Sequence, residues 1–247
     1  MNSNDEWHVV QKGSKKNQTN TSFHKEKVEA VWSHIFMNET ELLDKFRTSP
    51  IFEKTLAQIL QFLKPFLSNK SDINLTIRSI GVGPTTASLP AYLQTTFIYL
   101  IQESLKVFFS SNNIQVKKFL SIINDPVFTE KDLQYISEHG MTRVENDEEL
   151  MTSKEGEISI FYMPHCEKEL YVKVIKLNES NLKSCCLIGN SFKGYIRQIE
   201  LVGKQKAFEG FPVLKNLVKS DGYREEMLPG FESCYEAFNN TAFMTFN

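Results

Sequence analysis

His165 and Cys166 are adjacent residues whose side chains are well suited to chemistry in this 247-residue sequence. An imidazole titrates near neutral pH, and a thiolate is both a nucleophile and a soft metal ligand. The pair could therefore supply a general acid or base, a nucleophile or metal ligands. A catalytic triad also needs an orienting carboxylate, and zinc needs about four ligands. Because the spacing reveals neither set, we predict no metal site, and a hydrogen-bonded structural histidine is the simpler alternative.

Two glycines and an acid form a second group of candidate residues. The string Gly81-Val82-Gly83 could bring the backbone close to a phosphate, or it could simply make a tight strand-to-helix turn. It lacks the third glycine of a dinucleotide-binding fingerprint. Asp125 lies much further along the chain than the spacing of roughly 20 residues that is typical of a ribose-binding acid. Asp125 could instead fix the turn before Pro126.

Asn190 and Ser191 could hold a ligand or cap the following helix. Like the other candidates, they follow the carboxyl end of a predicted strand; these strands cover residues 75–80, 116–123, 158–163 and 182–188. Since parallel strands end at one edge of a sheet, where ligands bind, we expect one shared cleft. Its predicted ligand-binding residues are Gly81, Gly83, Asp125, His165, Cys166, Asn190 and Ser191.

Helical patterns separate these strands. Apolar residues recur at helical spacing from Leu89 to Phe108, and Thr129 to Asp132 has the spacing of a capping box. Residues 167–177 form another predicted helix. Strands that alternate with helices predict a parallel sheet with right-handed crossovers. The predicted fold class is therefore α/β, with a mainly parallel, doubly wound, Rossmann-like sheet.

The remaining segments define three predicted domains or regions. Residues 1–22 are polar and predict a disordered tail. Residues 23–70 predict two packing helices, the second of which begins at Ser49-Pro50. Residues 71–247 form the α/β domain. Within it we expect a short strand at 141–144, an acidic loop at 145–157, a helix at 212–219 and an extended end at 239–246.

The composition excludes several classes of protein. The net charge of −2 argues against a nucleic-acid binder that relies on a basic surface. The longest apolar runs stay below the roughly 18 residues of a membrane helix, and the first ten residues lack the apolar region of a secretory signal. The four cysteines do not have the spacing of a disulfide framework, so reduced thiols in the cytoplasm or nucleus fit best. We expect the adjacent Cys185 and Cys186 to be core residues that point to opposite faces of a strand.

Several of the strings that follow the predicted strands resemble the sensitivity-to-red-light-reduced (SRR-like) family. The resemblance covers residues 75–200 and the C-terminal tail. It is carried by four strings: Asp125-Pro126-Val127-Phe128, Phe161-Tyr162-Met163-Pro164-His165-Cys166, Gly189-Asn190-Ser191-Phe192 and Ala237-Phe238-Asn239-Asn240-Thr241-Ala242-Phe243.

The resemblance implies a regulatory protein. Plant members act in light signalling and the circadian clock, animal members are linked to haem biosynthesis, and the fungal benomyl-sensitivity member is linked to microtubule function. This chain has Asn124 where tyrosine often precedes Asp-Pro, Asn240 where aspartate is usual and Met244 where histidine is frequent. If those positions form a catalytic set, this member lacks part of it.

Two functional hypotheses follow. The first is a non-enzymatic regulator that binds a protein partner or a small ligand at the sheet edge, without direct contact to nucleic acid or membrane. The second is a methyltransferase-like enzyme that uses S-adenosylmethionine or another nucleotide. Haem is a weaker cofactor candidate because Cys166 precedes Glu167 and not the proline of a short haem-regulatory motif.

Overall fold

The fold is described here from a computed structural model, which defines residues 39–68, 73–205 and 208–247. The predicted tail at residues 1–22 lies outside these residues, and so does the first part of the segment 23–70, for which two packing helices are predicted. The division into a tail, a helical segment and an α/β domain therefore stays a prediction.

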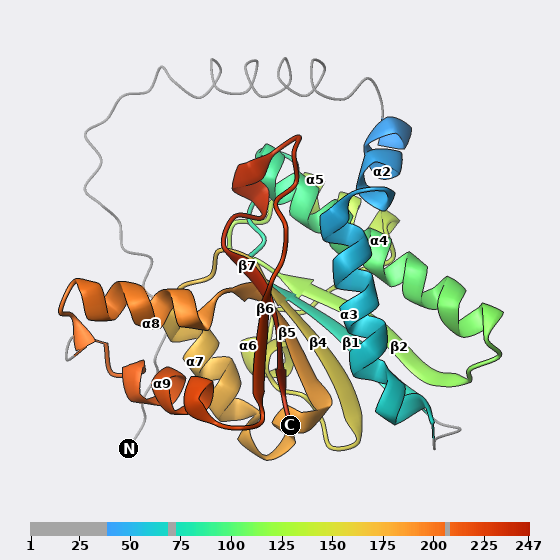
Figure 1. Ribbon diagram of the computed structural model, residues 1–247. Coiled ribbons are helices and arrows are strands. Elements are labelled where there is room, and N and C mark those ends of the chain that lie inside the picture. Colours follow the sequence, from blue (N-terminus) through green and yellow to red (C-terminus); the bar gives the residue numbers. More distant parts are fainter. Residues whose placement is uncertain (1–38, 69–72, 206–207) are drawn as a thin grey trace, which may run out of the picture.

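A single seven-stranded sheet forms the centre of the described chain, with the strand order β3-β2-β1-β4-β5-β7-β6 (Figure 1). The first five strands are parallel, whereas β7 runs antiparallel to both β5 and β6. The predicted mainly parallel sheet is thus confirmed. The strands are β1 (Ile73–Ile80), β2 (Val116–Asn124), β3 (Thr142–Arg143), β4 (Glu157–Met163), β5 (Cys185–Asn190), β6 (Tyr223–Met227) and β7 (Thr241–Phe246).

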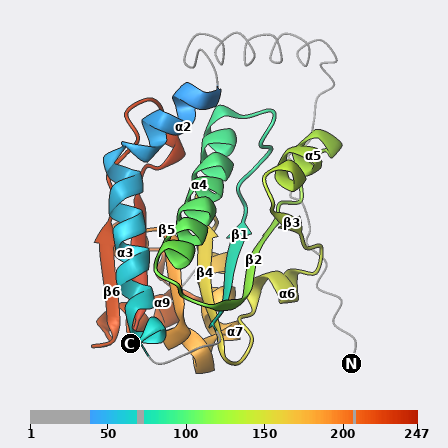
Figure 2. The same cartoon turned by 90° about the vertical axis from the view of Figure 1, so that its right-hand side faces the viewer.

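Helices cover both faces of the sheet, as in a doubly wound fold (Figure 1, Figure 2). One layer contains α2, α3 and α4, and the opposite layer contains α7, α8 and α9. The helices are α2 (Glu39–Arg47), α3 (Pro50–Leu67), α4 (Leu89–Ser111), α5 (Glu130–Glu138), α6 (Asp147–Met151), α7 (Lys168–Leu177), α8 (Phe192–Leu201) and α9 (Phe211–Lys219), with short 3-10 turns η1 (Glu179–Ser184) and η3 (Tyr235–Ala237).

Each face of the sheet has its own hydrophobic core. Ile77 and Phe97 belong to the core beneath α4, whereas Phe161 and Tyr171 belong to the core beneath α7. Side chains alternate between the faces along each strand. Cys185 accordingly lies in one core and Cys186 in the other, which confirms their prediction as core residues.

Local signals set several helix boundaries. The Ser49 hydroxyl accepts a hydrogen bond from the Phe52 N–H, and Pro50 occupies the first turn of α3. Thr129 and Asp132 form the predicted capping box of α5, with each side chain bonded to the other residue's N–H. These groups satisfy N–H donors that have no partner within the helix.

Three segments differ from the prediction. The acidic stretch predicted as a loop contains α6, because the Asn146 side chain accepts from the first N–H groups of that helix and three acids favour its N-terminus. The strand predicted from Leu182 begins at Cys185, because Leu182 lies in η1 and its carbonyl accepts from the Cys185 N–H. The strand β6 was not predicted, and it forms by pairing with β7.

A buried ion pair joins the two central strands. Arg78 of β1 is 2 % exposed, and its Nη2 lies 2.8 Å from Oε2 of Glu157 in β4. Arg78 also donates to Ser159 Oγ at 3.1 Å and to the Glu149 carbonyl at 2.6 Å, and Glu157 accepts from the Thr76 hydroxyl. Each buried charge is therefore compensated and hydrogen-bonded, which is the condition for burying it at low cost.

No helix in residues 39–68, 73–205 or 208–247 is long and apolar enough to cross a membrane.

Replacing Arg78 by methionine should destabilise the protein strongly, because it leaves the Glu157 carboxylate buried without its cation. We expect Arg78→Met to lower the free energy of unfolding by about 3–5 kcal/mol in urea denaturation. Arg47→Met is the matched control; its side chain is 55 % exposed, and we expect a change below about 0.5 kcal/mol. A loss below about 1 kcal/mol for Arg78→Met would contradict the structural role of the pair.

Candidate functional site

The candidate site lies at the carboxyl ends of the parallel strands, an edge that we call the rim. There β1 lies between β2 and β4. The chain moves outward from β1 to β2 and β3 and then returns to the other side of β1 as β4, so β1 and β4 flank a topological switch point. Residues 81–84 follow β1 and residues 164–166 follow β4 at this point.

Asp125 bonds to the glycine loop of the rim. Its Oδ2 accepts from the N–H of Gly83 at 2.8 Å, and its Oδ1 accepts from the N–H of Val127 at 3.0 Å. Gly81 and Gly83 have φ angles of 67° and 81°, which favour glycine. Asp125 is 6 % exposed, and its two hydrogen bonds tie the loop after β1 to the turn after β2.

Cys166 fills the space beside Gly81. Its thiol donates a hydrogen bond to the Ile80 carbonyl at 3.2 Å, and a Cβ added at Gly81 would lie 2.8 Å from its sulfur. Burial raises the pKa of the Cys166 thiol to about 12, with smaller contributions from the negative charges of Asp125 and Glu167. The thiol is therefore protonated at neutral pH, which makes it a poor nucleophile.

His165 is exposed at the rim and has a φ of 54°, an uncommon value for a residue with a side chain. Its N–H donates to Asn190 Oδ1 at 3.1 Å, and its Nε2 lies 3.2 Å from the Ala237 carbonyl. Nε2 must carry a hydrogen for that second bond. His165 thus connects the loop after β4 with the end of β5 and with η3.

Asn190 and Ser191 point to different partners. Asn190 Nδ2 donates to the Tyr195 hydroxyl at 2.7 Å, and that hydroxyl donates to the Cys166 carbonyl at 2.7 Å. Ser191 Oγ accepts from the Gly194 N–H at 2.8 Å and donates to Glu225 Oε1 at 2.6 Å. Ser191 is therefore the cap of α8, the alternative that the sequence left open for it.

The predicted residues form two bonded groups. The first group lies at the loop after β1, which contains Gly81 and Gly83 and is contacted by Asp125 and Cys166. The second group is the hydrogen bond between His165 and Asn190, which joins the ends of β4 and β5. No direct bond joins His165 to Asp125 or Gly81 among the described residues, and Ser191 faces Glu225. Whether these groups bind one ligand stays a prediction.

The sequence reasoning missed Gln94 and the segment around Ala237. Gln94 Nε2 in α4 donates to the Ala237 carbonyl at 2.7 Å, the same atom that His165 approaches. The segment that carries η3 therefore crosses from β6 towards α4 at the rim. A backbone acceptor has no residue-type signal, so only the family-like string at Ala237 indicated this segment.

The rim offers few reactive groups. Within the described residues, no three His, Cys, Asp or Glu side chains gather in a way that could hold a metal ion. The Asp125 carboxylate and the Cys166 thiol are bonded within the protein, and His165 is the exposed imidazole among the predicted residues.

Cys166 should resist alkylation because its raised pKa leaves about 10⁻⁴ of it as thiolate at pH 8. We expect iodoacetamide at pH 8 to modify Cys234 first, since Cys234 is the one cysteine of the four that is not fully buried. Raising the pH should speed modification of Cys166 for as long as the protein stays folded. Peptide mass spectrometry measures both rates, and equal rates at pH 8 would show an accessible, activated thiol at Cys166.

Solved structures with a similar arrangement include two methyltransferases. One is a Staphylococcus aureus protein solved as a candidate caffeoyl-CoA O-methyltransferase, with 12 % identity and a TM-score of 0.39 over 91 % of this chain and 100 % of that chain. The other is the plantazolicin methyltransferase BpumL in complex with SAH, with 10 % identity and a TM-score of 0.35 over 91 % and 99 %. Likeness at this level carries no argument about function.

Sequence comparison is more specific. The SRR1-like protein of Mus musculus is 31 % identical over 134 residues, which are 53 % of this chain and 49 % of the mouse protein. The match spans about half the length of that relative. The SRR1 domain family matches residues 42–245, a range that includes α3 and the sheet except for the last residue of β7, Phe246. The chain therefore belongs to the SRR1 domain family.

Proposed function

We propose that this chain is a non-enzymatic regulatory protein that binds a protein partner or a small ligand at its rim. The observation that carries the proposal is which rim side chains are accessible. The His165 side chain is exposed, and its backbone N–H is held by a hydrogen bond to Asn190. The side chains of Asp125 and Cys166 are buried and hydrogen-bonded within the protein. A binding surface needs a fixed shape and accessible contacts, and a catalytic site needs available acids, bases or nucleophiles.

The regulatory roles known for the family are the natural setting for such a surface. They include light signalling and the circadian clock, control of haem biosynthesis, and microtubule-related function, according to lineage. We assign the protein to the cytoplasm, with the nucleus as a second compartment. Direct binding to nucleic acid or membrane is not part of the proposal.

A methyltransferase-like enzyme is the second candidate, because a glycine loop after β1 and an acid after β2 flank the switch point. The residues present do not fit S-adenosylmethionine or a dinucleotide in this arrangement. Cys166 lies against Gly81, and both oxygens of Asp125 already accept backbone N–H groups. Cys166 therefore fills the space beside the glycine turn, and the Asp125 carboxylate, 6 % exposed, is turned toward the protein and away from a nucleoside at the rim.

Haem does not fit the rim either. The Cys166 sulfur is buried and bonded to the Ile80 carbonyl, and His165 Nε2 faces the Ala237 carbonyl. Both potential axial ligands are therefore directed at backbone acceptors, so haem is not part of the proposed function.

Removing the His165 imidazole should impair function without unfolding the protein. We expect His165→Gly and His165→Ala to change the free energy of unfolding by no more than about 1 kcal/mol, because one exposed hydrogen bond is lost. Glycine also accepts the positive φ of this position, so His165→Gly preserves the backbone. Both variants should fail to restore the phenotype of cells that lack the protein.

Lys117→Ala, at an exposed position near the opposite end of β2, is the control and should restore the phenotype. Full rescue by both His165 variants would contradict a binding role for the rim. Loss of rescue together with a destabilisation above about 3 kcal/mol would mark His165 as structural, because this exceeds the worth of one hydrogen bond.

A ligand panel tests the second candidate separately. We expect S-adenosylmethionine, S-adenosylhomocysteine, NAD and haem to leave the melting temperature unchanged, since the rim does not fit them. A ligand at one hundred times its Kd would stabilise the protein by about 2.7 kcal/mol, an effect that differential scanning fluorimetry detects. Stabilisation by S-adenosylhomocysteine would replace this proposal with the methyltransferase-like candidate.

A further inference from the structure

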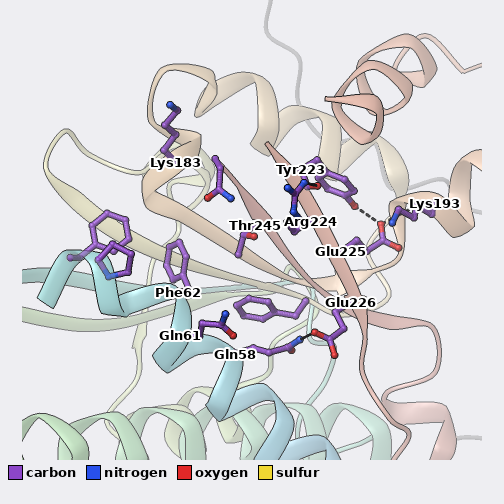
Figure 3. A pocket seen from close by; sticks show the side chains of 14 residues that line it. Gln58, Gln61, Phe62, Lys183, Lys193, Tyr223, Arg224, Glu225, Glu226 and Thr245 are labelled. Atoms are coloured by element: carbon purple, nitrogen blue, oxygen red, sulfur yellow. Dashed lines mark hydrogen bonds between the residues drawn. The ribbon is translucent and has the colours of Figure 1, made fainter. Parts of the chain in front are cut away.

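A groove of about 870 Å³ lies between α3 and the edge strand β6 (Figure 3). Gln61 and Phe62 contribute from α3, Arg224 from β6 and Thr245 from β7. None of the seven predicted rim residues lines it. The groove therefore shares no lining residue with the predicted site, although its Glu225 accepts from Ser191, and the inference below does not rest on the proposed function.

The groove follows the edge strand β6. The outward backbone of β6 is partly bonded already: the Tyr223 carbonyl accepts from Arg224 at 2.9 Å and the Met227 carbonyl accepts from Lys54 Nζ at 3.0 Å. In the described chain β6 is the last strand in the order and pairs only with β7. Arg224 and Glu226 alternate with Tyr223 and Glu225 along β6, so the two pairs project from opposite faces, and all four line the groove. A space that reaches both faces of an edge strand suits an added extended chain, which places alternate side chains on each face.

Three cations around the groove have no carboxylate partner. Lys183, Lys193 and Arg224 are exposed, and none of them forms an ion pair within the described part of the chain. Among the residues that the structure describes, the Arg224 guanidinium donates to the backbone carbonyls of Asp221, at 2.6 Å, and Tyr223, at 2.9 Å. These cations lie on both sides of β6 and remain available to anions (Figure 3).

The two carboxylates of the groove are already bonded. Glu226 lies 2.6 Å from Lys54 Nζ and accepts from Gln58 Nε2 at 2.6 Å. The hydrogen bond from Lys54 lowers the pKa of the Glu226 carboxyl. Glu225 accepts from the Ser191 hydroxyl at 2.6 Å. The lining side chains thus include three cations against two carboxylates, one of which is paired with Lys54, although the whole chain has a net charge of −2.

Aromatic rings form the apolar part of the groove. Phe62 and Phe66 are half-buried on α3, with ring centroids 5.4 Å apart, and Phe243 of β7 lies in the sheet beside them. An apolar side chain of a bound peptide can pack against such rings while its neighbours remain in the charged part.

We propose that β6 is a docking edge for an extended acidic segment of a partner protein. The segment lies along β6, its carboxylates face Arg224, Lys183 and Lys193, and an apolar side chain packs against Phe62. Charge complementarity selects this partner: the unpaired groups of the groove are cations, and the carboxylates beside them are occupied.

The probe is a fluorescent eight-residue peptide with two phenylalanines among six glutamates, measured by fluorescence anisotropy with the full chain. We expect saturable binding that weakens as the ionic strength rises from about 0.05 to about 0.3 M. Arg224→Glu combined with Lys183→Glu should weaken binding about tenfold or more, because two attractive contacts become repulsive. Gln61→Glu, a nearly isosteric change in the groove, should weaken it in the same direction.

Lys118→Glu is the matched control, since it reverses an exposed charge on β2 and should leave binding unchanged. Thermal melts verify that each variant is folded. Equal affinity for a peptide with lysines in place of glutamates, or unchanged affinity in the reversed variants, would overturn the proposal. So would absence of binding at about 1 mM peptide. Self-association of the wild type that Arg224→Glu abolishes would assign the edge to a second copy and also overturn it.

Discussion

The pairing of β1 with β2 on one side and β4 on the other is the constraint on which the rest of the structure depends. This pairing brings three loops together at the rim and creates the switch point between β1 and β4. The ion pair between Arg78 of β1 and Glu157 of β4 joins these two strands inside the protein. Each of the two charges can be buried there because the other compensates it. A buried ion pair thereby helps to hold together the two strands whose carboxyl ends form part of the rim.

The side chains at this rim form hydrogen bonds mainly with backbone groups of neighbouring rim segments. Asp125 holds the glycine loop, the Cys166 thiol closes the space beside Gly81, and His165 reaches the backbone of η3. Such a rim keeps its shape without a ligand, and it withdraws the carboxylate and the thiol from chemistry while it exposes the imidazole. This division of roles is the basis on which we propose recognition and not catalysis. In our proposal the edge strand β6 adds a second binding surface, an extended one lined by three cations that form no ion pair within the described residues.

Local signals made much of the fold predictable. The Ser49 cap and the capping box at Thr129 depend on neighbouring residues, so the sequence shows them directly. The position of the rim follows from parallel topology. In contrast, β6 becomes a strand through its pairing with β7, and the contacts of Asp125 and His165 use backbone groups of distant segments. Residue types do not reveal such partners. The sequence therefore indicated which residues lie at the rim, but not whether their polar groups are hydrogen-bonded within the protein or open to a ligand.

Amide hydrogen exchange at Gly83, measured by NMR in the free protein and again with millimolar S-adenosylhomocysteine, tests most directly whether the rim is held by its own bonds. If Asp125 bonds to this amide in the absence of ligand, Gly83 exchanges slowly, and S-adenosylhomocysteine leaves the rate unchanged. Fast exchange in the free protein that S-adenosylhomocysteine slows would contradict this account. It would show that the Gly83 amide is unprotected until a nucleoside binds to the glycine loop.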